Sequence, residues 1–213
     1  MDFLDQDLRN YVEQHTSSEN DLLKRINRET HIKTLKPRML SGHLQGRVLA
    51  MISHMIRPQR ILEIGTFTGY SAVCLAEGLA PDGKLVTIDI NEELESQVRR
   101  YFDEAGLTNK IDYRIGNALT VIPTLTDIFD LVFIDGDKEN YGRYFDMIVD
   151  KVRLGGFILA DNVLWSGKVV NSKSDKKTNA IVEFNAMVQR DPRVENVLLP
   201  IRDGIMMMRR VSL

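Results

Sequence analysis

Positions 60–71 of this 213-residue chain read RILEIGTFTGYS, an apolar, strand-like run followed by a turn that contains two glycines. The helix-like apolar run 71–76 follows directly. Glycine permits a tight turn, and the free backbone N–H groups at the start of a helix can bind a ligand. The segment therefore predicts a strand, a ligand-binding loop and a helix.

The residues around this turn favour one type of nucleoside cofactor. A second strand-like run, 84–88, ends in Asp89, where a carboxylate can accept hydrogen bonds from ribose hydroxyls. The spacing of Gly65 and Gly69 differs from the Gly-x-Gly-x-x-Gly pattern of dinucleotide sites. Glu63 would repel a pyrophosphate, but it suits the ammonium and sulfonium groups of S-adenosylmethionine. The sequence therefore favours S-adenosylmethionine over NAD.

Strand-like and helix-like runs alternate from Arg60 onward. Strands are expected at 60–64, 84–89, 111–115, 130–135 and 156–161, and helices at 70–80, 92–105, 118–125 and 141–152. This alternation predicts an α/β fold with a mostly parallel sheet and helices on both faces. After a helix at 178–190, the runs 194–199 and 204–211 flank a short glycine-containing connection, which predicts a C-terminal antiparallel hairpin.

The length and composition suit one globular domain, 1–213, with a helical extension over 1–57 and an α/β core over 58–213. Hydrophobic residues make up 43% of the chain and charged residues 27%. The net charge of −2 argues against a nucleic-acid partner. No apolar run approaches the roughly 20 residues of a membrane span, and no signal peptide is visible, so we expect a cytoplasmic protein. Cys74 is the single cysteine, which excludes an internal disulfide.

Polar residues end two further strands of the expected sheet. Asp135 and Asp137 follow the run 130–134, and Asp161 and Asn162 follow the run 156–160. Ligands of open parallel sheets bind outside the carboxyl ends of the strands. If the two strands are neighbours, Asp135, Asp161 and Asn162 form an oxygen-only site that suits Mg²⁺, Ca²⁺ or Mn²⁺. Helix capping and an Asx turn are the alternatives for these residues.

The motifs LEIGTFTGYS (62–71), FIDGDKENY (133–141), LADNVLWSGKV (159–169) and DGIMMMRR (203–210) resemble those of the cation-dependent O-methyltransferases, which include the caffeoyl-CoA and catechol enzymes. The resemblance extends from about Arg38 to Val211. It implies a Rossmann-like class I methyltransferase fold, S-adenosylmethionine as methyl donor, a divalent cation and a homodimer. An apolar stripe on the first helix (Phe3, Leu4, Leu8, Tyr11 and Val12) is compatible with a dimer.

The resemblance also implies roles for individual residues, each assigned by its position in a matching motif. The residues expected to contact the cofactor are Ser41, Glu63, Gly65, Thr66, Ser71, Asp89, Ala118, Asp135 and Asp137. Asp135, Asp161 and Asn162 match the metal ligands, and Lys138 matches the lysine proposed as general base. Asp135 is also expected to contact the acceptor, and Trp165 is a candidate wall for the acceptor ring, with core packing as its alternative.

Two departures from the plant enzymes concern the acceptor. Ser166 follows Trp165 where those enzymes have asparagine, and the segment 175–180 lacks their tyrosine-rich loop. These differences argue against a coenzyme A ester and favour a smaller catechol-like or phenolic acceptor. The expected reaction is metal-dependent methyl transfer to a hydroxyl of that acceptor.

Three other functions remain open from the sequence. An NAD-dependent oxidoreductase would use a similar sheet, but it would leave Asp135, Asp161 and Asn162 without a role. A non-catalytic S-adenosylmethionine-binding module would not need Lys138 or the metal ligands. A methyltransferase that acts on RNA or protein is disfavoured by the acidic balance and the missing basic stripe.

Overall fold

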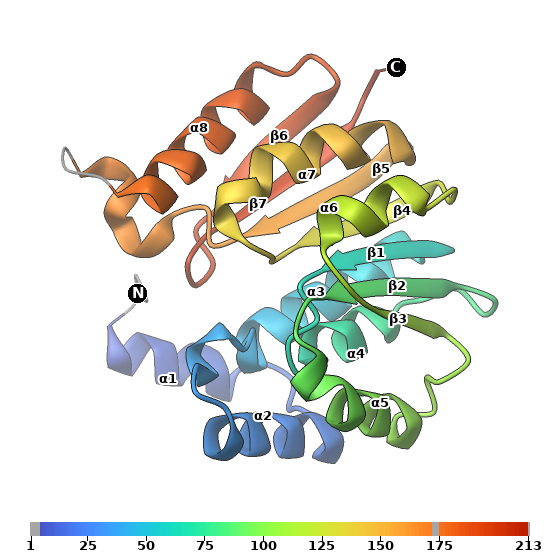
Figure 1. The fold of residues 1–213 in the computed structure, drawn as a ribbon. Helices are drawn as coiled ribbons and strands as arrows, with labels where there is room; N and C mark the ends of the chain where they lie inside the picture. Colours follow the sequence, from blue (N-terminus) through green and yellow to red (C-terminus); the bar gives the residue numbers. More distant parts are fainter. Residues whose placement is uncertain (1–4, 172–174, 213) are drawn as a thin grey trace.

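The centre of the computed structural model is a seven-stranded sheet of order β3-β2-β1-β4-β5-β7-β6 (Figure 1). The structure describes residues 5–171 and 175–212. The strands are β1 (Arg60–Ile64), β2 (Lys84–Asp89), β3 (Ile111–Ile115), β4 (Phe129–Ile134), β5 (Val152–Asp161), β6 (Val194–Leu199) and β7 (Ile205–Arg210). Strands β1 to β5 pair in parallel, and β7 is antiparallel to both of its neighbours. The predicted parallel sheet and C-terminal antiparallel hairpin are therefore confirmed.

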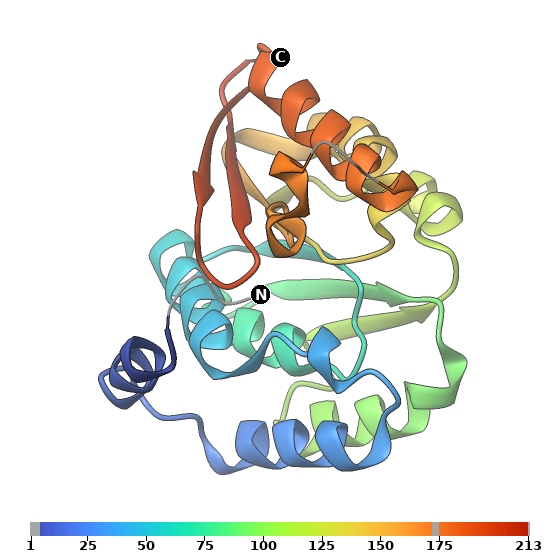
Figure 2. The same cartoon turned by 90° about the vertical axis from the view of Figure 1, so that its left-hand side faces the viewer.

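Helices cover both faces of this sheet. In Figure 1, α6 (Ala118–Val121), α7 (Tyr141–Ile148) and α8 (Lys176–Arg190) lie on one face, and α3 (Gly42–Ile56), α4 (Tyr70–Ala76) and α5 (Glu95–Glu104) lie on the other. The helices α1 (Gln6–Gln14) and α2 (Asp21–Lys33) form an outer layer against the second group, as Figure 2 shows from the side. This layering places a hydrophobic core on each face.

Each core contains large aromatic side chains. On the α7 and α8 side, the Phe184 ring meets Tyr141 edge-on at a centroid distance of 5.4 Å, and Phe145 packs nearby. On the α3 to α5 side, Tyr101 and Phe102 are buried. Complete burial of one such side chain stabilises the fold by roughly 1.5–3 kcal/mol. The cores hold the sheet rigid, so the loops at its carboxyl edge start from fixed positions.

Several expected boundaries were wrong, and the structure shows a physical reason for three of them. The strand expected from 156 begins at Val152, because the irregular pairing between Phe129 and Leu131 accommodates the glycine-containing segment 153–156. The helix expected over 70–80 ends at Ala76, and a Cβ on Gly78 would lie 2.2 Å from the carbonyl carbon of Ser53. The helix expected over 118–125 divides into α6 and the 3₁₀ turn η3 (Ile122–Thr124), because a proline in the turn lacks an N–H.

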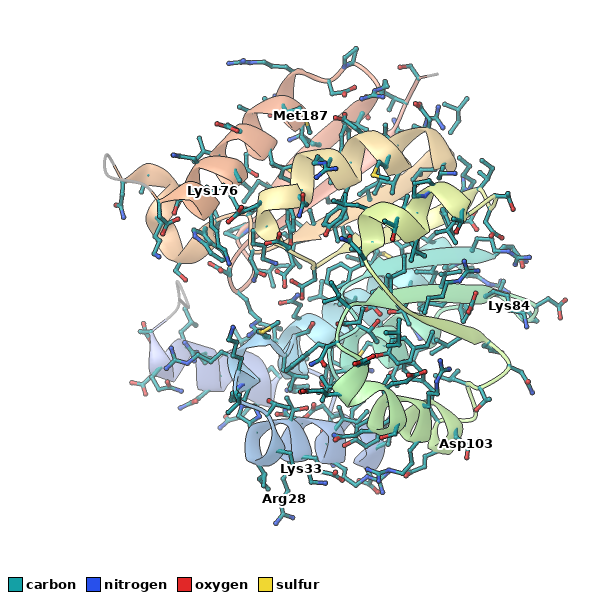
Figure 3. All side chains as sticks on the ribbon, viewed as in Figure 1. Arg28, Lys33, Lys84, Asp103, Lys176 and Met187 are labelled. Atoms are coloured by element: carbon teal, nitrogen blue, oxygen red, sulfur yellow. The ribbon has the colours of Figure 1, made fainter. Side chains whose placement is uncertain are left out.

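Charged side chains and several large apolar side chains, among them Leu35, Met55 and Ile90, are exposed at the surface. Arg28, Lys84 and Asp103 project outward from three different elements (Figure 3). No helix within the described ranges is both long enough and apolar enough to cross a membrane. Helix α1 buries none of its residues against this chain, and Leu8 and Tyr11 are 46% and 59% exposed. Phe3 and Leu4, the first members of the predicted stripe, lie outside the described residues.

Candidate active site

Four parallel strands bring acidic residues to one edge of the sheet. Glu63 lies in β1, Asp89 ends β2, Asp135 follows β4 and Asp161 ends β5. Because the strands run in the same direction, their carboxyl ends meet at this edge. The structure thus brings together the strand-end residues that the sequence predicted to form a site.

The loop after β1 is shaped by glycine and by Asp89. Gly65 has a φ of +103°, and a Cβ there would lie 2.4 Å from the carbonyl oxygen of Asp135. Asp89 Oδ2 accepts a hydrogen bond of 2.6 Å from the backbone N–H of Phe67. Gly69, at φ +80°, precedes the first residue of α4. Backbone therefore packs on backbone here, and the loop is held at both of its ends.

Glu63 is an acid buried beneath this loop. Its Oε2 accepts a hydrogen bond of 2.5 Å from the Thr87 hydroxyl, which also lies 2.5 Å from Thr66 Oγ1. Its Oε1 has no hydrogen-bond partner within the described part of the chain. Burial is the main cause that raises the pKa of Glu63 to about 8, and the nearby hydroxyl groups of Ser71 and Thr87 oppose this shift. A buried acid with one open oxygen fits a ligand that carries a positive charge or a hydrogen-bond donor.

Five of the predicted cofactor residues line a narrow cavity of about 10 Å³ at the loop after β1. Its lining includes Ser41, Gly65, Thr66, Ser71 and Asp135. Asp89 does not line the cavity itself, but it accepts a hydrogen bond from the backbone of Phe67, which does. The two remaining predicted residues differ in exposure. Ala118 is buried at the start of α6, whereas Asp137 is exposed and its Oδ2 accepts from Asn140 Nδ2 at 2.8 Å.

The candidate metal ligands are neighbours at the ends of β4 and β5. The register pairs Ile134 with Ala160, so the residues that follow, Asp135 and Asp161, lie side by side. Burial raises the pKa of Asp135 to about 6, the ammonium of Lys138 opposes this shift, and the negative charge of Asp161 adds to it. Asn162 follows with a left-handed backbone at φ +60°. The donor set is two carboxylates and one amide, which suits a hard cation.

Within the described residues, no group of three or more His, Cys, Asp or Glu side chains is arranged to hold a metal. The site at β4 and β5 contains only two such side chains, and its third donor would be the amide oxygen of Asn162. This donor set leaves coordination positions for substrate or water oxygens, as Mg²⁺ sites commonly do.

Lys138 is held against the same carboxylate. Its Nζ donates to Asp135 Oδ1 and to the Tyr141 hydroxyl, each at 2.7 Å. The Tyr141 hydroxyl in turn contacts the carbonyl oxygens of Ile134 and Asp161 at 3.2 and 3.0 Å. Tyr141 therefore ties the ends of β4 and β5 together while it holds the lysine. The sequence analysis did not identify this tyrosine, although it closes the FIDGDKENY motif.

Two further residues of the site were also missed. Gln45 in α3 is fully buried and donates from Nε2 to Asp161 Oδ2 at 2.7 Å. Arg202, in the β6–β7 connection, donates to Gln45 Oε1 at 3.1 Å and to the Leu40 carbonyl at 3.0 Å. A signal for Gln45 exists in the sequence, because it shares a helical face with the apolar Leu49 and Ile52.

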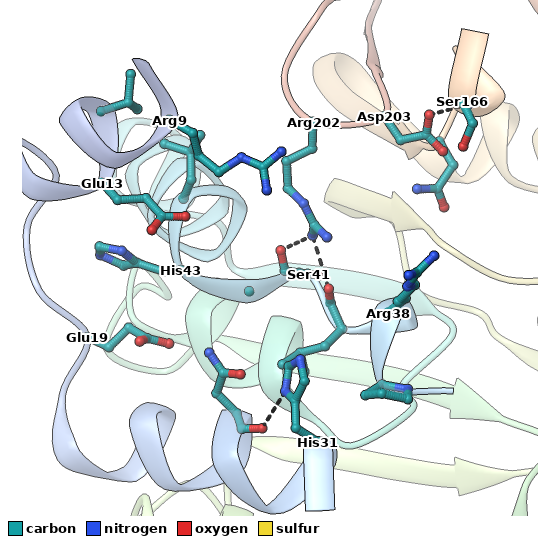
Figure 4. Close-up of a pocket in the computed structure, with 17 residues that line it drawn as sticks. Arg9, Glu13, Glu19, His31, Arg38, Ser41, His43, Ser166, Arg202 and Asp203 are labelled. Carbon is teal, nitrogen blue, oxygen red and sulfur yellow. Dashed lines mark hydrogen bonds between the residues drawn. The ribbon is translucent and has the colours of Figure 1, made fainter. Parts of the chain in front are cut away.

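A larger cavity of about 800 Å³ is lined by one of the candidate cation ligands, Asn162 (Figure 4). Its lining includes Asn162, Ser166 and Asp203 on one side and residues of α1, α2 and α3 on the other. Arg9, Arg38 and Arg202 point toward its centre in Figure 4. Ligand sites for small molecules are commonly of this size. The segment 1–57 therefore contributes walls to the cavity rather than lying apart from it.

Trp165 directly precedes Ser166, which lines this cavity, but Trp165 itself does not line it. It is partly buried and packs against the hydrophobic core on the α7 and α8 side. Its buried indole Nε1 has no hydrogen-bond partner within the described ranges. The neighbouring Ser166 lines the cavity instead, and its backbone N–H donates to Asp203 Oδ1 at 2.5 Å.

Solved structures with the same architecture place the fold and the site in one class. The SAH-bound methyltransferase of Podospora anserina is 28% identical, with a TM-score of 0.90 over 97% of this chain and 94% of that chain. The O-methyltransferase TomG of Streptomyces achromogenes, in complex with SAM, is 28% identical, with a TM-score of 0.88 over 97% and 96%. The chain has the fold of a Rossmann-like methyltransferase. This class follows from the strand order, from the glycine loop after β1 and from the similarity to these two structures.

The sequence comparison narrows this class to a family. The family model described as O-methyltransferase matches residues 3–211. The caffeoyl-CoA O-methyltransferase of Mesembryanthemum crystallinum is 38% identical over 182 residues, which cover 79% of this chain and 71% of the relative. The enzyme of that name from Petroselinum crispum is 35% identical over 181 residues, 79% and 75% of the two chains. The chain belongs to the O-methyltransferase family and is an enzyme.

Proposed function

We propose that this enzyme transfers a methyl group from S-adenosylmethionine to a hydroxyl of a catechol-like or phenolic small molecule, with the participation of a divalent cation. The observation that carries the proposal is the position of Asp135. It lines the narrow cavity of the predicted cofactor residues, and it also lies beside Asp161 at the candidate cation site. A methyl donor and a cation-bound acceptor would therefore meet at one carboxylate.

The narrow cavity supports the cofactor assignment. Glu63, with its open Oε1, offers a partner for the cationic part of the methionine, and Asp89 at the end of β2 suits the ribose hydroxyls. Ser41, Gly65, Thr66 and Ser71, which line the cavity, would also contact the cofactor. Ala118 would lie beside the adenine, and Asp137 would be a further contact. Relatives of known structure carry SAM or SAH, which agrees with this assignment.

The cation would be held by Asp135, Asp161 and Asn162, and Mg²⁺ suits their oxygens best, with Ca²⁺ or Mn²⁺ as alternatives. When bound, a divalent cation supplies positive charge that orients the acceptor oxygens and lowers the pKa of the attacking hydroxyl. The fit depends on the chemistry of the donors: two carboxylates and an amide, with no sulfur or imidazole.

Lys138 is the candidate general base. Its Nζ lies within hydrogen-bond distance of Asp135, so a hydroxyl bound at this carboxylate would lie within reach of Nζ. In its neutral form, Lys138 would accept the hydroxyl proton there. Tyr141 and Asp135 fix the direction of the amine, and alignment of the reactants can supply roughly 7–11 kcal/mol of the barrier reduction.

The large cavity is the candidate acceptor site. We assign the segment 1–57 as a helical extension and lid of a single 1–213 domain, because Arg9, His31 and His43 contribute to the cavity walls. The exposed apolar residues of α1, Leu8 and Tyr11, support a homodimer. Trp165 stays a prediction for the acceptor wall.

Methyl transfer to a panel of catechols and monophenols, measured with Mg²⁺ and then with EDTA, tests the proposal. We expect catechols to be methylated, chelation to abolish the activity, and added Mg²⁺ to restore it. Full activity after exhaustive chelation would refute the cation. Calorimetry with S-adenosylmethionine and with NAD provides the control on the cofactor, and NAD binding alone would refute the whole assignment.

A further inference from the structure

Gln45 is a polar side chain among the mostly apolar buried residues of α3. It lies in the first half of α3, is fully buried and shares its helical face with Leu49 and Ile52. Burial of an amide without hydrogen bonds destabilises a fold. Burial of the Gln45 amide therefore requires hydrogen-bond partners for both its oxygen and its nitrogen.

Both ends of the Gln45 amide are satisfied, and by groups of opposite charge. Nε2 donates to Asp161 Oδ2 at 2.7 Å, and Oε1 accepts from the Arg202 guanidinium at 3.1 Å. A carboxylate can only accept and a guanidinium can only donate, so a single orientation of the amide satisfies both partners. Gln45 thus forms a bridge with a defined direction between a strand end and the β6–β7 connection.

The other oxygen of Asp161 is also held. Asp161 Oδ1 accepts from the backbone N–H of Asn162 at 2.7 Å. With one donor on each oxygen, the carboxylate cannot rotate, and each oxygen keeps a lone pair for a further ligand. Asp135, which follows the neighbouring strand, is the other carboxylate of the candidate cation site.

We propose that Gln45 is a positioning residue for the cation site: it fixes the Asp161 carboxylate in the orientation that binds the cation, and Arg202 fixes Gln45. This inference rests on the proposed cation-dependent function. Metal-binding carboxylates generally need such outer partners, and the loss of one typically lowers metal affinity about 10–100-fold.

Arg202 connects this arrangement to the large cavity. Its guanidinium donates to the carbonyl oxygens of Leu40 and Ser41 as well as to Gln45, and it lines the cavity (Figure 4). All three acceptors face Nη1 of Arg202, which carries two N–H groups, so they share these donors and together attach the β6–β7 connection to the start of α3. Replacement of Gln45 removes one of the three and leaves the two backbone contacts in place, so the cofactor cavity should keep its shape.

The test compares Gln45→Met with Ser53→Ala. Methionine has a similar volume to glutamine but cannot donate to Asp161. Ser53 lies in the same helix, is equally buried, and donates its hydroxyl to the Leu75 carbonyl at 2.6 Å, away from the cation ligands. Mn²⁺ affinity, measured by electron paramagnetic resonance on the SAH-saturated protein, should fall about 10–100-fold in Gln45→Met and stay within twofold in Ser53→Ala.

SAH affinity, measured by calorimetry, separates positioning from general damage. We expect it to stay within twofold of wild type in both variants, although both should unfold at lower temperature. An unchanged Mn²⁺ affinity in Gln45→Met, or an equal loss of SAH affinity, would overturn the inference. If Gln45→Met does not fold, Gln45→Asn, whose amide is one methylene shorter, should show the same selective loss of Mn²⁺ affinity.

The same titrations distinguish this inference from the proposed function. If the wild-type protein binds no Mn²⁺ and methylates catechols in EDTA, the cation-dependent function fails and the inference fails with it. If the wild type binds Mn²⁺ and requires it, but Gln45→Met binds it equally well, only the role of Gln45 is refuted.

Discussion

The ammonium of Lys138 donates to Asp135 Oδ1 over 2.7 Å, so the candidate base and a candidate cation ligand form one ion pair. The Lys138 and Asp135 side chains are only 11% and 17% exposed. A cation bound at Asp135 would compete with Lys138 for the same carboxylate. Occupation of the cation site would thereby weaken the hold of Asp135 on the Lys138 side chain.

Loss of a candidate cation ligand should lower the activity more than loss of the candidate general base, Lys138. General base catalysis typically contributes about 10²–10⁴-fold, whereas positioning of the reactants contributes more. We therefore expect Asp161→Ala to lower kcat/KM for a catechol more than Lys138→Ala does. Steady-state kinetics at saturating Mg²⁺ measures both variants. A Lys138→Ala enzyme that is less active than Asp161→Ala would contradict this ordering.

Glu63 should make stability fall as the pH rises. Its pKa is about 8 in the folded protein and its ordinary value is 4.5, so between these values only the folded state binds the proton. The free energy of unfolding therefore decreases between pH 4.5 and pH 8, by on the order of several kcal/mol in total, and levels off above pH 8. Glu63→Gln removes the titration.

Urea unfolding of the cofactor-free protein at several pH values checks this expectation. Wild type and Glu63→Gln should have similar stability near pH 5, and the variant should be increasingly the more stable of the two up to pH 8. Parallel stability curves for the two proteins would show that Glu63 is ionised in the folded state at neutral pH.

Asp89 should contribute to cofactor affinity, because two backbone hydrogen bonds hold its carboxylate at the end of β2. Its oxygens accept from the backbone N–H groups of Phe67 and Asn91, at 2.6 and 2.8 Å, and they would also face the ribose. Hydrogen bonds to a charged group contribute about 1.5–3 kcal/mol each, so Asp89→Ala should lower SAH affinity at least tenfold. Calorimetry measures this loss. Asp112→Ala, an exposed carboxylate in β3, is the control and should bind SAH as wild type does.

Much of the sheet and of the strand-end chemistry could be predicted from the sequence. Each strand is a short apolar run, and Asp89, Asp135 and Asp161 follow or end such runs, so their convergence is a consequence of parallel pairing. The end of the helix expected over 70–80 depends on a tertiary contact, the close packing of Gly78 against Ser53.

The partners of the site residues could not be predicted in this way. Gln45 and Asp161 are separated by 116 positions, and Arg202 and Gln45 by 157. No local pattern encodes a contact over such distances, because it depends on how α3 and the β6–β7 connection dock onto the sheet. A polar residue on an apolar helical face indicates that a partner exists, but it does not identify the partner.

Substitution of Gly65 should disturb the cofactor cavity and the candidate cation site together. A Cβ at this position would lie 2.4 Å from the carbonyl oxygen of Asp135, and the φ of +103° disfavours any L side chain. Gly65→Ala must therefore displace Asp135, which lines the cofactor cavity and neighbours Asp161. We expect SAH and Mn²⁺ affinities to fall together. Gly106→Ala is the matched control, since its φ is +67° and a Cβ there meets nothing within 4 Å.

The control variant should lose about 1–2 kcal/mol of stability and keep both affinities, because only the left-handed backbone disfavours alanine there. If Gly65→Ala behaves in the same way, the contact between Gly65 and Asp135 has no part in binding. If it loses SAH affinity but binds Mn²⁺ normally, the two sites do not share Asp135 as proposed. Only a joint loss in Gly65→Ala, absent from Gly106→Ala, agrees with one carboxylate that serves both sites.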